Sequence, residues 1–183
     1  MLKNKNLFWL IVILLVVIDQ LIELFVWHFL MDYGGTQIIG DLVTFYPVQN
    51  LNGTFLHSVM GTYANHLFTH ILNFLLLYVV LGLRQYLTVK NVNSKIIDMG
   101  LLFFIIHRIC FFIDLAFWGG SLDFIRIRGL FIFGPENVYL AIAAVCMVIY
   151  YVTNYRVVDK IGGKEVKAFF KFCFSKKMFE RAD

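Results

Sequence analysis

Acidic side chains interrupt the apolar stretches of this chain, where a charge is costly. Asp19 and Glu23 stand one helical turn apart in the first stretch, so they share a face of any helix that forms there. Asp114 lies near the end of the third stretch, and Glu136 begins the fourth. A carboxylate inside a bilayer is a candidate functional group by default, for example as a member of a proton relay.

Histidines form a second group that could do chemistry. His66 and His70 are one helical turn apart, a spacing that can bind a metal ion. No Glu follows His66, so the HExxH pattern of zinc proteases is absent. Hydrogen bonding between helices is the simpler interpretation for both and for His107, and no metal or other cofactor is expected. Arg108, deep in the third stretch, is expected to need an acidic partner.

The composition indicates lipid as the solvent. Of the 183 residues 60% are hydrophobic, and the mean hydropathy is +0.76, whereas soluble domains are about 45–50% apolar. The net charge of +4 lies in short stretches between and after the apolar runs, which argues against a basic surface for nucleic acid. The three cysteines are scattered and predict neither a disulfide framework nor a CxxC metal site.

Four stretches are long enough to cross a bilayer as helices, since a hydrocarbon core of about 30 Å needs roughly 20 apolar residues. They span about residues 7–30, 66–87, 96–118 and 137–155. The first is similar to a signal peptide, but it continues past residue 24 without a cleavage motif, so a retained helix is the better interpretation. The sequence therefore predicts an all-α membrane protein with a single transmembrane domain over residues 1–155.

Lysine and arginine set the orientation of these helices. Two precede the first helix, three lie at or in the link between the second and third, and eight follow the fourth. Residues 31–65 have none, and residues 119–136 have only Arg126 and Arg128. The positive-inside rule therefore predicts a multi-pass cell-membrane protein with both termini cytoplasmic and these two segments outside.

The segments outside the helices carry their own patterns. Residues 31–65 contain short apolar runs between turn residues, which predict a small β-containing segment at the outer surface. Residues 156–183 form a basic cytoplasmic tail with phenylalanines among the lysines, a pattern typical of an amphipathic segment on anionic lipid. A frayed, solvated tail is the alternative. We expect a monomer with membrane lipid as a partner.

Polar residues and one glycine from four distant parts of the chain are brought to the outer face by this topology. The set comprises Asp19, Glu23, Asn50, Asn52, Gly53, Asp114, Glu136 and Asn137. Asp19, for example, lies about 18 Å along a helix that runs outward, at 1.5 Å per residue. The convergence predicts a functional site at the outer face. Polar groups that merely flank helix ends, with Asn137 as an N-cap, are the alternative.

The order of these residues resembles the motifs of a known family. It runs Asp19-Gln20, Asn52-Gly53, Ile113-Asp114, Gly119, Asp123-Phe124 and Phe133. This order is similar to that of the lipoprotein signal peptidases, also called signal peptidase II, over about residues 7–155. The size, the four helices and the outer polar cluster agree with that family, although each motif alone is weakly specific.

The resemblance implies an aspartic endopeptidase that works in the membrane plane without a cofactor. Such enzymes cut the signal peptide from prolipoproteins, just before the lipid-modified cysteine, with two aspartates that flank a water and share a proton. Asp114 matches the first catalytic aspartate. The positions that match supporting, substrate-binding residues are Asp19, Gln20, Asn52, Gly53 and Asp123.

Departures from the family's pattern leave the chemistry open. Asn137 takes the place of the second catalytic aspartate, and an amide cannot carry the proton of a dyad. Either Glu136 substitutes from the neighbouring position or the dyad is broken. Other residues usual in the family are replaced here by Glu23, Cys110, Phe111 and Leu115.

Three alternatives follow from these departures. A degenerate relative could bind lipoprotein or lipid without cleaving it. A small transporter or accessory subunit could use Asp19, Glu23 and Asp114 as a proton relay. A metal-binding membrane protein would be centred on His66 and His70.

Overall fold

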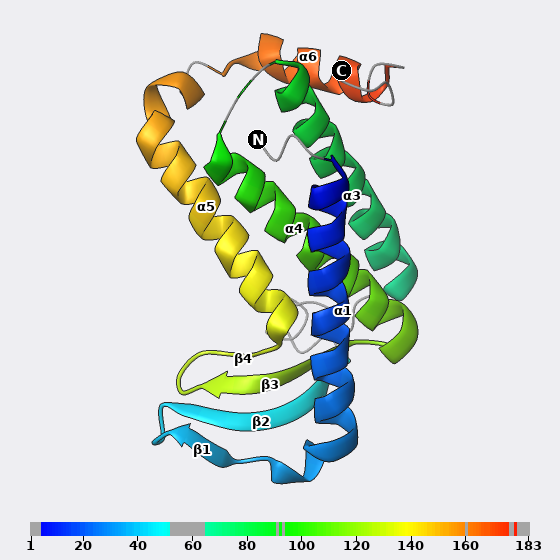
Figure 1. Cartoon of the computed structure of the whole chain (residues 1–183), viewed down its shortest axis with the longest axis vertical. Helices are drawn as coiled ribbons and strands as arrows, with labels where there is room; N and C mark the ends of the chain where they lie inside the picture. The colour runs from blue at the N-terminus through cyan, green and yellow to red at the C-terminus, as the bar shows by residue number, and fades with distance from the viewer. Residues whose placement is uncertain are drawn as a thin grey trace.

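The main feature of the chain is a bundle of four helices, each long and apolar enough to cross a membrane (Figure 1). The computed structural model describes residues 5–51, 65–90, 92, 94–159, 161–175 and 178. The four helices are α1 (Lys5–Phe29), α3 (His66–Val89), α4 (Lys95–Ile113) and α5 (Pro135–Val158). The four predicted helices are thus confirmed, as is the helical membrane class with a small β segment.

The helix α4 is the centre of the bundle, since it packs against α1, α3 and α5. In its apolar stretch 50% of the residues are buried, compared with 17–22% in the other three helices. The core around it comprises Phe8, Val12, Leu102, Ile105, Ile106 and Cys110. Large apolar side chains such as Leu10, Leu67 and Val152 remain exposed on α1, α3 and α5. Helices that are apolar all round in this way are typical of a bundle in lipid.

Local signals in the sequence fix where the helices begin. The side chain of Asn65 accepts a hydrogen bond from the backbone N–H of Phe68 at 3.0 Å and caps α3. Ser94 caps α4 in the same way through Ile97, at 3.3 Å. Pro135 is the first residue of α5, a position where its missing N–H has no intrahelical partner to lose.

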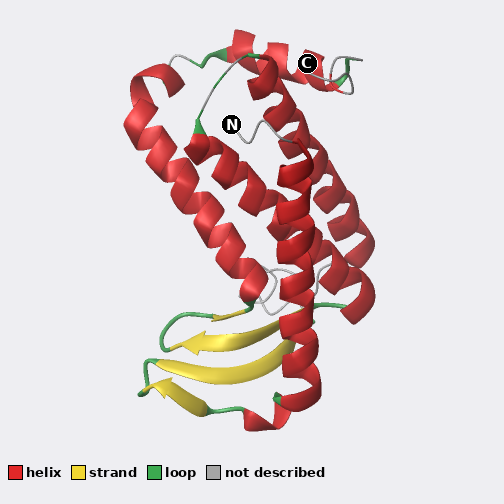
Figure 2. Ribbon diagram, viewed as in Figure 1, coloured by secondary structure: helices red, strands yellow, loops and turns green. Residues whose placement is uncertain are grey.

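A four-stranded antiparallel sheet lies at one end of the bundle (Figure 2). Its strands, in order across the sheet, are β1 (Thr36–Ile39), β2 (Val43–Asn50), β3 (Ser121–Ile127) and β4 (Ile132–Phe133). The strands predicted within residues 31–65 are therefore present, preceded by the 3-10 turn η1 (Met31–Tyr33). The link over residues 119–136 adds β3 and β4, which extend the sheet beyond the segment between the first two helices.

The basic tail forms a further helix, α6 (Gly163–Cys173), which lies across the end of the bundle away from the sheet (Figure 1). It packs against α3, where the rings of Phe169 and Phe172 lie 5.7 and 5.4 Å from that of Tyr86. The lysines of α6 are exposed, so it is an amphipathic helix and not a frayed segment. We call this end, with α6 and the start of α1, the α6 end, and the end with β1–β4 the sheet end.

Candidate functional site

Three carboxylic side chains meet at the sheet end of the bundle. Glu23 comes from α1, Glu136 from the first turn of α5, and Asp114 opens η2 (Asp114–Trp118), a π-helical turn that continues α4. One oxygen from each acid lies within 4.8 Å of one oxygen from each of the others. All three side chains are at most 3% exposed. The π-helical distortion agrees with a functional role, because such turns are frequent at functional sites.

The amide of Gln20 connects two of these acids. Its Nε2 donates to Asp114 Oδ1 at 2.8 Å and to Glu23 Oε2 at 3.1 Å. Gln20 and Glu23 are three residues apart on α1, so they share one helix face. The Asp19-Gln20 pair, which the resemblance marked as supporting, thus includes a residue in direct contact with Asp114.

The position of Glu136 is fixed by neighbours close in sequence and by α4. The side-chain amide of Asn137 donates to Glu136 Oε1, and Nδ1 of His107 donates to the backbone carbonyl of Glu136 at 3.1 Å. Gly134 leaves room for the carboxylate, because a Cβ at that position would collide with Glu136 Oε2. Glu136 therefore faces Asp114, and Asn137 lies inside the first turn of α5, past the N-cap position.

Several carboxylate oxygens in this cluster have no hydrogen-bond partner among the described residues. They are Glu23 Oε1, Asp114 Oδ2, Glu136 Oε2 and both oxygens of Asp19. Asp19 lies one turn before Glu23 on α1 and is fully buried. Because buried charges in proteins are paired or coordinate metals, these oxygens require a proton or a cation. Glu23, Asp114 and Glu136 are the one group of three acids, histidines or cysteines in the described chain that could hold a metal ion.

Asp123 is a further buried acid, on β3. Nδ2 of Asn50, the last residue of β2, donates to Asp123 Oδ2 at 3.1 Å. Burial raises the pKa of Asp123 to about 6, against the opposing effect of this hydrogen bond. The predicted residues Asn52 and Gly53 lie outside the described residues.

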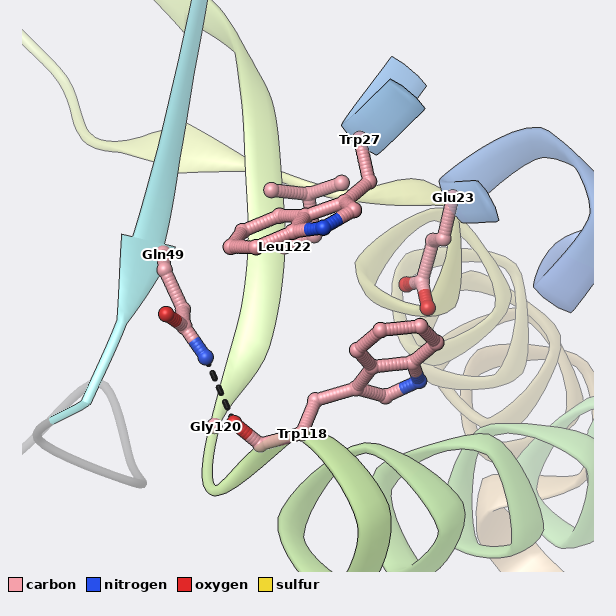
Figure 3. A pocket seen from close by; sticks show the side chains of 6 residues that line it. All are labelled: Glu23, Trp27, Gln49, Trp118, Gly120 and Leu122. Carbon is pink, nitrogen blue, oxygen red and sulfur yellow. Dashed lines mark hydrogen bonds between the residues drawn. The ribbon is translucent and has the colours of Figure 1, made fainter. Parts of the chain in front are cut away.

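A small pocket opens next to Glu23 (Figure 3). Its lining residues are Glu23, Trp27, Gln49, Trp118, Gly120 and Leu122. The ring centroids of Trp27 and Trp118 are 6.1 Å apart, and Figure 3 shows the Glu23 carboxylate directed toward the Trp118 indole. Nε2 of Gln49 donates to the Trp118 carbonyl at 2.5 Å, which holds β2 against η2. The Glu23 carboxylate can thus be reached through a pocket that two indole rings line.

The histidines and the arginine singled out in the sequence have structural contacts. His66 is exposed, His70 packs edge-on against Phe112 at 5.3 Å, and neither joins a group of metal ligands among the described residues. The expectation of an acidic partner for Arg108 is wrong, because its Nε donates to the side-chain oxygen of Asn73. A neutral amide thus accepts one N–H of this guanidinium between α3 and α4.

Two contributions to the site were not predicted from the sequence. Glu23 was expected among the outer acids and, with Asp19 and Asp114, in the proton relay of the transporter alternative, but not beside the Asp114/Glu136 pair, because the resemblance expects a lysine at its position. The aromatic pair Trp27 and Trp118 gave no signal of its own, since Trp is common wherever a helix meets the membrane interface. Only their distance across the fold shows that they line one pocket.

The sequence matches no family model and no curated protein. The fold does match solved structures. Two bacterial membrane enzyme structures, determined by the in meso method at 1.9 and 2.3 Å resolution, superpose with TM-scores of 0.67 and 0.65. The first is 18% identical and covers 82% of this chain and 95% of that chain, and the second is 16% identical and covers 86% and 94%. The chain therefore has the fold of a bacterial membrane enzyme.

Proposed function

We propose that this chain is a divergent member of the signal peptidase II type, an aspartic endopeptidase of the membrane that cleaves prolipoprotein signal peptides. One observation carries the proposal. Oxygens of Asp114 and Glu136 lie within 4.8 Å of each other, although the two residues come from different helices. Asp114 matches a catalytic position of that family, and Glu136 is adjacent to the other.

The proposed chemistry uses a proton shared by the two acids. Two carboxyl groups at this distance do not ionise together easily, so one keeps its proton while the other is charged. The charged carboxylate takes a proton from a water molecule, which attacks the scissile carbonyl carbon. The protonated carboxyl donates its proton to the carbonyl oxygen as charge develops there. The acid that took the proton from water then gives it to the leaving amide nitrogen, so that the C–N bond breaks, and the other acid takes back the proton of the hydroxyl group. Gln20 and Asn137 would position the two acids through the hydrogen bonds described above.

The surroundings of the dyad fit a substrate that arrives within the membrane plane. The acids lie at the sheet end, beside the pocket of Trp27 and Trp118. With the orientation favoured by the basic residues, this end is the outer face and both termini are cytoplasmic. On this proposal α6 rests on anionic membrane lipid with Lys164, Lys167 and Lys171 toward the headgroups.

The test is cleavage of a diacylated prolipoprotein by the purified full-length protein in detergent or lipid. We expect cleavage by the unmutated protein and its loss, by at least a hundredfold, in Asp114→Asn and in Glu136→Gln. Asp32→Asn, which removes an exposed acid of η1, is the matched control and should cleave normally. No cleavage by the unmutated protein would defeat the proposal.

A second candidate is a relative that binds lipoprotein or lipid without cleaving it. The observation that favours it is Glu23, which adds a third acid where the family pattern has a lysine, together with the replacements at Cys110, Phe111 and Leu115. Crosslinking of a prolipoprotein to the pocket without cleavage would support this candidate. The transporter alternative is weaker, since a relay needs acids across the membrane, and Glu23, Asp114 and Glu136 all lie at the sheet end.

A further inference from the structure

The three facing acids carry more negative charge than the proposed hydrolysis needs. An aspartic dyad uses two carboxyl groups and one proton, but Glu23 brings a third carboxylate within 4.8 Å of Asp114 and Glu136. Each of the three has one oxygen without a hydrogen-bond partner in the described parts of the chain. A proton shared by two of them leaves the charge of the third uncompensated, in a group whose side chains are at most 3% exposed.

Basic side chains nearby are engaged elsewhere. Arg108 donates to Asn73, and Nδ1 of His107 donates to the backbone carbonyl of Glu136. The amides of Gln20 and Asn137 reach only the other oxygens of the three acids. Within the described residues none of these acids forms an ion pair. Among the described residues, the protein therefore gives these partnerless oxygens no positively charged partner.

We propose that Glu23, Asp114 and Glu136 bind one hard divalent cation, of the Ca²⁺ or Mg²⁺ class, between their carboxylates. All three ligands are carboxylates, the donors that such cations prefer. No cysteine or histidine, which would favour zinc, belongs to the group. Oxygens on opposite sides of Ca²⁺, each at about 2.4 Å, are about 4.8 Å apart, so acid oxygens that lie within 4.8 Å of one another can bind the same ion.

The pocket beside Glu23 provides a second observation that indicates a ligand. Glu23 is 3% exposed, its Oε1 has no partner among the described residues, and its side chain lines the pocket with Trp27 and Trp118. Figure 3 shows this carboxylate next to the Trp118 indole, with the Trp27 indole to one side. A cation that enters along this pocket would reach Glu23 first and then the other two acids.

A regulatory consequence follows, and it rests on the proposed function. A cation in this position occupies oxygens of Asp114 and Glu136 that the hydrolysis needs for proton transfer. It therefore inhibits cleavage, and removal of the cation by a chelator restores it. Glu23 thereby becomes the residue that makes the dyad sensitive to divalent cations.

Tb³⁺ is a direct probe of this site, because it occupies Ca²⁺ sites and emits when an excited indole lies nearby. Trp27 and Trp118 line the pocket beside Glu23. In the purified full-length protein we expect saturable emission at one ion per chain, displaced by Ca²⁺. Glu23→Gln and Glu136→Gln should each weaken binding at least tenfold. Asp41→Asn, which removes a largely exposed acid of the sheet end, should leave binding unchanged.

Two results would overturn the proposal: no binding by the unmutated protein at millimolar Ca²⁺, or binding that both glutamine variants retain. Thermal unfolding of the unmutated protein gives a readout that needs no variant, since a ligand of the folded state raises Tm. No rise in Tm with Ca²⁺ would also overturn it. Cleavage assays with a chelator separate this proposal from the proposed function: binding without any cleavage refutes the hydrolysis only, and cleavage that Ca²⁺ does not slow refutes the inhibition.

Discussion

Asp19 and Asp98 are both buried aspartates of membrane-spanning helices, but they lie at opposite ends of the bundle. At the α6 end, Asp98 interacts electrostatically with Arg84, whose guanidinium also lies 3.8 Å from the Phe8 ring. At the sheet end, neither oxygen of Asp19 has a hydrogen-bond partner among the described residues. Although Arg84 Nε has no hydrogen-bond partner among the described residues either, one end of the bundle places an opposite charge near its buried aspartate, and the other does not.

The packing at the α6 end follows the same pattern. The hydroxyl of Tyr78 donates to the backbone carbonyl of Cys173, which ties α6 to α3. Gly82 permits this approach, because a Cβ at that position would lie 2.8 Å from Cys173 Sγ. A buried polar group without a partner costs about 1–3 kcal/mol, so the sheet end is the destabilised region. On the proposed function, the destabilised sheet end is also the end that holds the acids of the site, as expected where activity and stability conflict.

The largest expected effect is the difference between two matched substitutions, which should change the free energy of unfolding in opposite directions. Asp98→Asn removes the charge that faces Arg84 and should lower the free energy of unfolding by about 3 kcal/mol, as when one partner of a buried ion pair is lost. Asp19→Asn removes a buried carboxylate without a partner and should raise it by about 1 kcal/mol. Chemical denaturation of both variants and the unmutated protein in one detergent measures the difference.

The control for this pair is Asp41→Asn, in which the acid is largely exposed and the change should lie within about 0.5 kcal/mol of zero. If Asp19→Asn destabilises the protein as much as Asp98→Asn does, the two ends do not differ in the way proposed. Asp19 would then have a structural role like that of Asp98.

The helices could be predicted because their signal is strong and local. Length and apolar character alone define four membrane helices, and Asn65 and Ser94 mark two of their starts. The strands within residues 31–65 were also predictable, since short apolar runs between turn residues are typical of them. The pairing of β2 with β3 was not, because it joins residues such as Phe45 and Ile125 that are distant in sequence.

The sequence predicted that the acids of the site lie at one end of the bundle, but it did not predict which of them face each other. The topology alone brings Asp19, Glu23, Asp114 and Glu136 toward one end of the bundle. Whether Glu136 or Asn137 faces Asp114 depends on where α5 begins, and a shift of one residue turns a side chain by about 100°. The start at Pro135 and the space left by Gly134 decide it in favour of Glu136. Neither fact is visible as a periodic pattern in the sequence.

A smaller effect is expected at Gly134, where the site depends on the absence of a side chain. Gly134→Ala places a Cβ against Glu136 Oε2 and against the Leu122 carbonyl, so the Glu136 carboxylate must move. We expect at least a tenfold loss of both Tb³⁺ binding and prolipoprotein cleavage, about 1.4 kcal/mol for each tenfold. Gly34→Ala is the matched control, because its nearest neighbour would be Pro47 at an ordinary 3.8 Å. Unchanged binding in Gly134→Ala would show that Glu136 is not held in the position described.

The smallest effect concerns Asp123, which is buried at the sheet end but, unlike Asp19, accepts a hydrogen bond from Asn50. Burial raises its pKa from 3.8 to about 6, so the folded state binds this proton more tightly than the unfolded state. The stabilising contribution is therefore complete below about pH 4 and is lost as pH rises through about 6. From pH 5.5 to 7.5 the loss should be about 1 kcal/mol.

Denaturation of the unmutated protein and Asp123→Asn at several pH values isolates this contribution, because the other acids titrate in both. As pH rises over this range, the free energy of unfolding of the unmutated protein should fall by that amount relative to that of the variant. A difference that stays constant across this range would mean that the Asn50 hydrogen bond compensates fully for burial. Asp123 would then be a compensated acid like Asp98. The uncompensated acids of the sheet end would be confined to Asp19 and the three acids Glu23, Asp114 and Glu136.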